Sequence, residues 1–204
     1  MTHRFAELAF TTAVKAVQDH YGVRHDNERL ERDFGPNDTM LERETEFIAQ
    51  RDSFYLATVS ETGWPYVQHR GGPAGFLQVV DPKRLAFADY RGNKQYISLG
   101  NIAGNDRCAL FLMDYPARRR LKLLGRLRMH DVADAPSELV ERLRPYPYRA
   151  AMERVAVIEV EAYDWNCSQH ITPRYTEAQV RNAVAPLHAR IAELEALLAT
   201  RPTS

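Results

Sequence analysis

Strand-like runs follow one another from Ser53 to Trp165 with only short turns between them. Each run is rich in β-branched and aromatic residues, and turn residues such as Gly63 and Pro65 separate neighbouring runs. The runs are "SFYLATVS", "YVQHR", "GFLQVV", "RLAFADY", "RCALFLMDY", "RRLKLLGRLRMHDV" and "RVAVIEVEAYDW". Because few helices separate them, the pattern predicts a mainly β protein with a six- to seven-stranded antiparallel barrel rather than a parallel sheet.

Helical patterns precede the strands and interrupt them once. The segment "RFAELAFTTAVKAVQDHYG" has apolar residues at helical spacing and predicts one amphipathic helix. The next stretch, "VRHDNERLERDFGPND", gives no assignment, and "TMLERETEFIAQR" predicts a second helix behind a Thr39–Glu42 capping box. A short helix in "APSELVERLRP" is expected to begin after Pro136 and to end at Pro145.

The C-terminal tail has the pattern of an amphipathic helix. Its apolar residues alternate spacings of four and three behind a Thr176–Gln179 capping box; they are Val180, Val184, Leu187, Ile191, Leu194 and Leu198. These apolar residues would be buried either by packing on the barrel or by packing on a partner subunit. The expected organisation is an N-terminal helix and connector (1–38), a barrel domain (39–175) and the C-terminal helix (176–204).

Composition excludes several classes of protein. The 204 residues contain 27 basic and 27 acidic side chains, so no overall charge favours nucleic acid or an anionic membrane. No window approaches the length of a membrane span and the first residues lack a signal-peptide core, so we expect a cytoplasmic protein. Cys108 and Cys167 lack metal-ligand spacing and are expected to be thiols, with no metal bound.

The segment "ADYRGNKQY" follows a predicted strand and has two interpretations. Arg-Gly-Asn-Lys is ordinary turn chemistry. The backbone N–H groups near Gly92 and Asn93, with the ammonium of Lys94, are also suited to an anion-binding nest.

Polar side chains share strand faces at two further places. Alternation places Gln68 and Arg70 on one face of their strand and His69 on the other. In "RRLKLLGRLRM" the basic residues Arg120 and Lys122 begin a face that Arg126 and Arg128 continue. This face is either a solvated outer surface or a basic wall for a phosphate or an electron-rich ring.

The order of "GWPYVQHR", "LAFADYRGNKQ", "ALFLMDY" and "RRLKLLGRL" resembles the flavin-binding split barrels of the pyridoxamine 5'-phosphate oxidase superfamily. The resemblance covers roughly Thr39 to Trp165, and "YDWNCSQHITPR" resembles a bacterial branch of that superfamily rather than the oxidase itself. It implies a Greek-key split barrel, FMN as the cofactor, and a homodimer with the cofactor at the subunit interface.

The resemblance also implies roles for individual residues. Gln68 occupies a position where the oxidase has arginine. In the oxidase a serine-arginine-lysine turn binds the phosphate, and of these three residues only the lysine, Lys94, is present here. The resemblance implies that Arg91 or Arg70 replaces the missing arginine. Arg120 and Lys122 match the strand that faces the flavin ring. The full expected cofactor-binding set is Gln68, His69, Arg70, Asp89, Tyr90, Arg91, Gly92, Asn93, Lys94, Arg120, Lys122, Trp165, Gln169 and His170.

The loop after the last strand carries several side-chain donors. The same resemblance implies that the substrate side of the cofactor site is lined by Trp165, Gln169 and His170. A lone tryptophan is, however, more commonly a core residue. Nothing in the sequence marks Cys167 as a nucleophile, so it is expected to be an inert thiol.

The function expected from the sequence is an FMN-dependent oxidoreductase acting on a small organic molecule, with no catalytic residue identified. The lost serine and arginine of the phosphate turn argue against pyridoxamine phosphate as substrate. The alternatives are a cofactor-binding module without turnover (flavin, deazaflavin, or haem with His69 or His170 as axial ligand) and a structural dimer that works through its tail.

Overall fold

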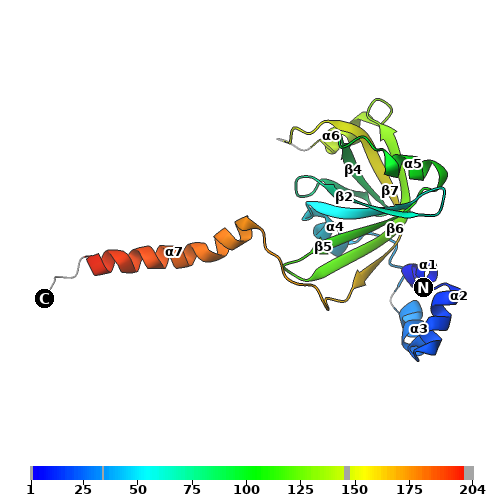
Figure 1. Ribbon diagram of the computed structural model, residues 1–204, viewed down its shortest axis with the longest axis horizontal. Coiled ribbons are helices and arrows are strands. Elements are labelled where there is room, and N and C mark those ends of the chain that lie inside the picture. The colour runs from blue at the N-terminus through cyan, green and yellow to red at the C-terminus, as the bar shows by residue number, and fades with distance from the viewer. Residues whose placement is uncertain (1, 34, 145–147, 200–204) are drawn as a thin grey trace. The chain divides into compact units, whose positions relative to one another are not determined.

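A single antiparallel sheet of seven strands forms the body of the protein (Figure 1). The computed structural model describes residues 2–33, 35–144 and 148–199. The strands are β1 (Ser53–Val59), β2 (Pro65–Gly71), β3 (Leu77–Asp81), β4 (Arg84–Tyr90), β5 (Arg107–Asp114), β6 (Arg119–Asp131) and β7 (Met152–Asn166). All seven predicted strands are therefore confirmed.

The sheet order is β2-β1-β5-β6-β7-β4-β3, and every neighbouring pair is antiparallel. The order is not sequential, because β5, β6 and β7 lie between the two hairpins β1–β2 and β3–β4. This mainly β arrangement, with helices before and after it, is the split barrel that the sequence predicted.

A β-bulge between Leu124 and Gly125 bends β6 where it pairs with β7. A Cβ atom at Gly125 would lie 2.5 Å from the carbonyl oxygen of Glu159, so only glycine allows the two strands to approach this closely.

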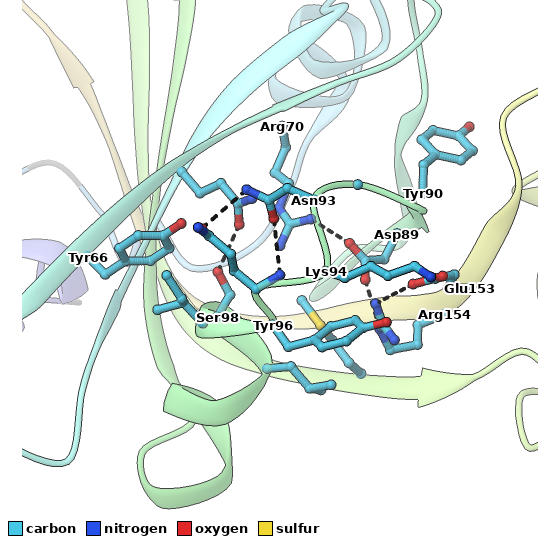
Figure 2. A pocket seen from close by; sticks show the side chains of 16 residues that line it. Tyr66, Arg70, Asp89, Tyr90, Asn93, Lys94, Tyr96, Ser98, Glu153 and Arg154 are labelled. Carbon is cyan, nitrogen blue, oxygen red and sulfur yellow. Dashed lines mark hydrogen bonds and ion pairs between the residues drawn. The ribbon is translucent and has the colours of Figure 1, made fainter.

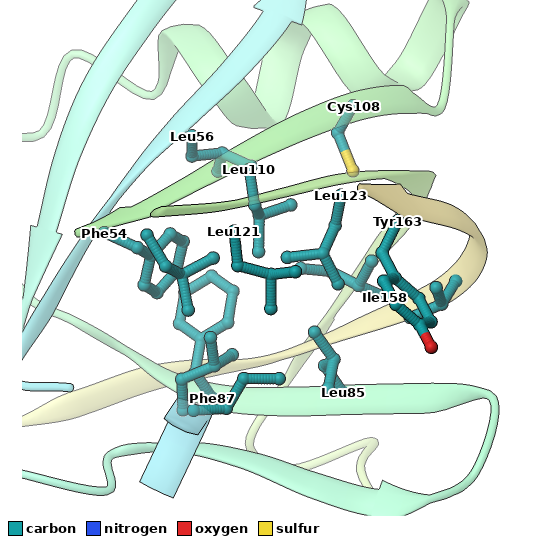
Figure 3. Packing of buried hydrophobic residues seen from close by; sticks show 14 of the residues in the cluster. Phe54, Leu56, Leu85, Phe87, Cys108, Leu110, Leu121, Leu123, Ile158 and Tyr163 are labelled. Atoms are coloured by element: carbon teal, nitrogen blue, oxygen red, sulfur yellow. The ribbon is translucent and has the colours of Figure 1, made fainter. Parts of the chain in front are cut away.

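The inward faces of the strands form one hydrophobic core, part of which is drawn in Figure 3. Alternate side chains along β5 and β6 point into this core. Four of them are at most 1% exposed: Leu110, Leu112, Leu121 and Leu123. Two aromatic side chains, Phe54 and Phe87, pack edge to face with ring centroids 5.2 Å apart.

The N-terminal region differs from the prediction of one long helix. Two helices, α1 (Arg4–Ala9) and α2 (Thr12–His20), replace it, because the Thr11 hydroxyl accepts from the N–H of Val14 and starts a new helix. The charged stretch left unassigned forms α3 (Arg24–Asp33), whose Arg24 binds Glu31 at 2.7 Å.

The second predicted helix is α4 (Glu42–Ala49), and its cap lies two residues later than expected. Leu41 is the N-cap, and the Glu44 carboxylate accepts from its N–H at 3.3 Å. The short helix α6 (Ser137–Arg142) follows Pro136 as predicted, whereas Pro145, its expected end, lies outside the described residues.

One helix was not predicted at all. Helix α5 (Ile97–Gly104) follows the loop after β4, and the buried Asn101 amide donates to the Thr58 hydroxyl of β1 at 2.9 Å. This contact anchors α5 to the sheet.

The chain divides into two compact units, one of residues 1–114 and 119–167 and the other of residues 115–118 and 168–204. The second contains α7 (Glu177–Ala199). The predicted capping box is present, since the Thr176 N–H donates to Gln179 Oε1 at 2.9 Å and the Gln179 N–H donates to the Thr176 hydroxyl at 3.2 Å. Among the described residues, no helix is long and apolar enough to cross a membrane.

Candidate functional site

A polar pocket lies where β2, β4 and β7 meet the loop that leads into α5 (Figure 2). Each element contributes side chains because of the strand period: Tyr66, Gln68 and Arg70 alternate along one face of β2 and are half-buried. The lining consists of Tyr66, Gln68, Arg70, Asp89, Tyr90, Gly92, Asn93, Lys94, Gln95, Tyr96, Ile97, Ser98, Leu99, Met129, Glu153 and Arg154.

A buried carboxylate joins two arginines at the floor of the pocket. Asp89, whose side chain is 5% exposed, accepts from Arg70 Nη1 at 2.5 Å and from Arg154 Nε at 2.8 Å. Figure 2 shows Asp89 between the two guanidinium groups. Asp89 and Arg154 are direct partners in the β4–β7 register, so the sheet itself aligns this pair. Two cations share one carboxylate, which leaves the cluster positively charged.

A second carboxylate lies at the rim. Glu153 accepts from Arg91 Nε at 2.9 Å and from Arg154 Nη2 at 3.1 Å. The hydrogen bond from Arg91 and the charge of Arg154 hold the pKa of Glu153 below its usual range. Although burial opposes the charged form of Arg154, its hydrogen bond to Asp89 raises the pKa of this guanidinium. Glu153 and Arg154 are therefore both charged at neutral pH.

The loop between β4 and α5 turns sharply over the pocket. Lys94 and Tyr96 both have left-handed backbone conformations, with φ of 59° and 53°. The Asn93 side chain supports the turn, because its Oδ1 accepts from the Gln95 N–H and its Nδ2 donates to Gln95 Oε1, both at 3.2 Å. Left-handed residues within a turn are among the backbone conformations from which anion-binding nests are built.

Lys94 and the first turn of α5 add unneutralised positive charge to this loop. No ion pair joins Lys94 to a carboxylate in the part of the chain that the structure describes. Helix α5 begins immediately after Tyr96, and the first N–H groups of a helix have no acceptors within it. The Ser98 hydroxyl, in this first turn, donates to Gln68 Oε1 at 3.1 Å and so links the loop to β2.

Two buried polar atoms in the pocket wall lack hydrogen-bond partners within the described residues: Arg70 Nε and the Tyr90 hydroxyl. Burial raises the pKa of Tyr90, so the phenol keeps its proton. Buried donors are normally paired, and these two are therefore suited to an acceptor supplied from outside the chain.

The family model for pyridoxamine 5'-phosphate oxidase matches residues 40–167, more than half of the chain. The protein belongs to the pyridoxamine 5'-phosphate oxidase family. The matched segment contains the whole sheet and the polar pocket, and nearly coincides with the resemblance noted in the sequence. No curated protein sequence matches the chain.

Solved structures of similar fold are distant in sequence. HupZ from Group A Streptococcus is 16% identical, with 67% of this chain and 100% of the other covered and a TM-score of 0.49. An FMN-binding protein from Syntrophomonas wolfei is 13% identical over 76% and 97% of the two chains, with a TM-score of 0.48. A pyridoxamine 5'-phosphate oxidase-related FMN-binding protein from Nostoc punctiforme is 13% identical over 56% and 73%, with a TM-score of 0.39.

In this member of the pyridoxamine 5'-phosphate oxidase family, half of the expected cofactor-binding residues line the polar pocket. They are Gln68, Arg70, Asp89, Tyr90, Gly92, Asn93 and Lys94. Arg91 is exposed beside it and binds Glu153. His69 lies on the opposite face of β2, against Tyr55.

Three more expected residues lie outside the pocket lining, and their roles beside the flavin ring (Arg120, Lys122) or the substrate (Trp165) stay predictions. Lys122 forms an ion pair with Asp164 at 2.8 Å, and the Arg120 Nε is buried without a partner within the described residues. Trp165 is held by a hydrogen bond from its Nε1 to Glu44 Oε1 at 2.7 Å. None of these three lines the pocket.

The last two expected residues, Gln169 and His170, belong to the second compact unit and are exposed. Their contribution to a cofactor site stays a prediction.

Sequence reasoning missed several lining residues. Tyr66 was detectable, because it precedes Gln68 and Arg70 on the same strand face. Arg154 and Glu153 were not, since only the β4–β7 register places them beside Asp89. Tyr96 was missed together with helix α5, and its ring lies 5.0 Å from the Arg154 guanidinium.

Proposed function

We propose that the protein is an FMN-dependent oxidoreductase that acts on a small organic substrate as a homodimer. The pyridoxamine 5'-phosphate oxidase family binds flavins, and the chain belongs to it. FMN in particular is favoured over an unphosphorylated flavin by the charge of the pocket, which has the character of a phosphate site.

The observation that carries this proposal is the loop 91–96 facing the Arg70–Asp89–Arg154 cluster. A terminal phosphate there would accept from backbone N–H groups and the Lys94 ammonium, and would offer an acceptor to the unpartnered Arg70 Nε. The residues present therefore fit a phosphate dianion, despite the loss of the family's serine and arginine from this turn. Arg70 is our candidate for the guanidinium that replaces the lost arginine, because Arg91 is exposed, binds Glu153 and is not itself part of the pocket lining.

Bound FMN supplies reversible two-electron chemistry at N5 of its ring. The chain supplies orientation and charge: Arg70 and Lys94 fix the phosphate end, and Asp89 holds Arg70 in place. Tyr90 keeps a proton on its hydroxyl and offers it as a hydrogen bond. We place the ring end at the subunit interface, where Gln169 and His170 are the candidates for the substrate side.

The first test is the visible spectrum of the purified protein, with chromatography of the chromophore released by heat. The proposal expects a yellow protein that releases FMN, or a colourless one that binds added FMN more tightly than riboflavin by at least tenfold. A colourless protein that binds neither would overturn it. A red protein with a haem spectrum would indicate the haem-binding alternative.

Turnover is tested separately from binding. The FMN-loaded protein is reduced anaerobically by light and mixed with candidate oxidants, and reoxidation is followed in the visible. Reoxidation by a small organic acceptor faster than by free FMN supports an oxidoreductase. If the bound flavin is reoxidised by every acceptor at the same rate as free FMN, the protein is a cofactor-binding module without turnover.

A further inference from the structure

Helix α7 presents an apolar stripe whose residues are exposed, except for the half-buried Val184. Val180, Leu187, Ile191 and Leu194 are each more than 40% exposed, and no residue of α7 is buried. The stripe continues to Leu198, which is 65% exposed. Exposed apolar stripes of this length on a helix mark a surface that another element covers.

The residue types along the stripe select one kind of partner. With Val180 taken as heptad position d, the d positions are Val180, Leu187 and Leu194, and the a positions are Val184, Ile191 and Leu198. β-Branched residues at a with leucine at d favour a parallel pair of helices over trimers and tetramers. Two of the three a positions are β-branched, and two of the three d positions are leucine.

The charges beside the stripe agree with a parallel pair. Arg190 is at position g, and Glu195, five residues later, is at position e. In a parallel coiled coil a g residue faces the e residue of the next heptad on the other helix, so Arg190 would face the partner's Glu195, twice by symmetry. Within one chain Arg190 binds Glu193 at 2.6 Å, an exposed pair that contributes little and does not compete strongly.

The proline inside α7 is compatible with this pairing. Pro186 lies at position c, on the side of the helix away from the a and d residues. Its missing N–H removes one intrahelical hydrogen bond, and its ring crowds the carbonyl of Asn182, which favours a bend there, but the proline side chain replaces no contact of the stripe. We infer that α7 pairs with α7 of a second copy of this chain in a parallel two-stranded coiled coil.

The coiled coil is short, at fewer than three heptads from Val180 to Leu198. Two copies already held together by their barrels would bring the helices to an effective concentration near the millimolar range. This supporting effect rests on the homodimer of the proposed function, whereas the choice of partner and direction rests on α7 alone.

Engineered cysteines in the full-length chain test the pairing. In a Cys167→Ser background, Val180→Cys and Leu194→Cys place thiols at d, and Asn182→Cys and Ala196→Cys place matched thiols at the outer position f. Under mild oxidation we expect both d variants to form disulfide-linked dimers at least tenfold faster than both f variants. Equal rates at d and f, or no dimers at either d position as in an antiparallel pair or a helix packed on its own barrel, would overturn the inference.

Charge reversal tests the register. Added to the Leu194→Cys variant, Arg190→Glu and Glu195→Arg alone should each slow disulfide formation severalfold, and the double reversal should restore it. Ala196→Arg, which adds a charge at outer position f, is the control that should change nothing. If the double variant stays as slow as the single ones, the g–e pairing is wrong. FMN content is measured on every variant, so failure of the coiled coil is distinguishable from failure of the proposed cofactor.

Discussion

At the scale of single residues, Asp89 balances the positive charge of two arginines in the pocket. Its carboxylate is the shared acceptor of Arg70 and Arg154, and all three side chains are largely removed from water. Breaking a buried ion pair leaves uncompensated charge, which costs more than the intact pair contributes.

Asp89→Asn should therefore destabilise the protein without FMN by about 3 kcal/mol, because two guanidinium groups lose their common anion. Chemical denaturation measures this loss. The matched control is Asp81→Asn, which removes an exposed pair with Arg84 and should cost under about 1 kcal/mol. FMN should recover part of the loss at Asp89, since its phosphate brings a negative charge to the same cluster. Equal losses in the two variants would contradict the role given to Asp89.

Lys94 should contribute to phosphate binding and little to stability. Lys94→Met is expected to weaken FMN binding about tenfold, the equivalent of one charge-assisted hydrogen bond, while riboflavin binding stays unchanged. Titration of flavin fluorescence provides both affinities. Lys83→Met, which removes an ion pair with Asp38 away from the pocket, is the control. A parallel loss of riboflavin affinity would show that Lys94 acts on the ring end instead.

At the scale of elements, the sequence predicted the strands and helices that follow from the local spacing of apolar residues. It missed the helix that depends on contacts with residues distant in the chain. All seven strands follow from alternation, and the capping box of α7 follows from Thr176 and Gln179. Helix α5 contains two glycines and has little intrinsic helix propensity, and its contact between Asn101 and Thr58 exists only once β1 is in place.

The bulge in β6 gives a prediction at this scale. Gly125→Ala would push a Cβ to 2.5 Å from the Glu159 carbonyl oxygen and should destabilise the protein by about 1–3 kcal/mol. The control is Gly100→Ala in α5, where no atom lies within 4 Å of the added Cβ and the helix should gain about 0.5–1 kcal/mol. Denaturation midpoints compare the two, and a neutral Gly125 variant would show that β7 shifts to accommodate the methyl group.

At the scale of the whole molecule, two buried acids make stability fall at alkaline pH. Burial raises the pKa of Cys108 from 9.0 to about 12, and burial together with the charge of Glu44 raises that of Tyr163 from 10.0 to about 12. Above pH 9 the unfolded chain loses protons that the folded chain retains. The free energy of unfolding therefore falls from about pH 9 to pH 12, by up to about 1.4 kcal/mol per pH unit for each group.

Urea denaturation at a series of pH values checks this slope. Cys108→Ala should remove most of the slope between pH 9 and pH 10, because in the unfolded chain the thiol titrates about one pH unit below the Tyr163 phenol. Cys167→Ser replaces the exposed thiol and should leave the slope unchanged. If Cys108→Ala retains the full slope, the alkaline loss comes from groups other than this thiol.

The sequence by itself determined the strands, their faces and the position of the polar loop 91–96, because alternation and turn chemistry act between residues close in the chain. It also placed Gln68 and Arg70 on one face and Lys94 in the loop. Only the tertiary structure decided that Asp89 pairs with Arg154, 65 residues away, and that Lys122 and Trp165 bind Asp164 and Glu44 rather than line the pocket. Those pairings depend on strand register and on helix α4 packing, which are set by burial across the whole sheet and leave no local pattern in the chain.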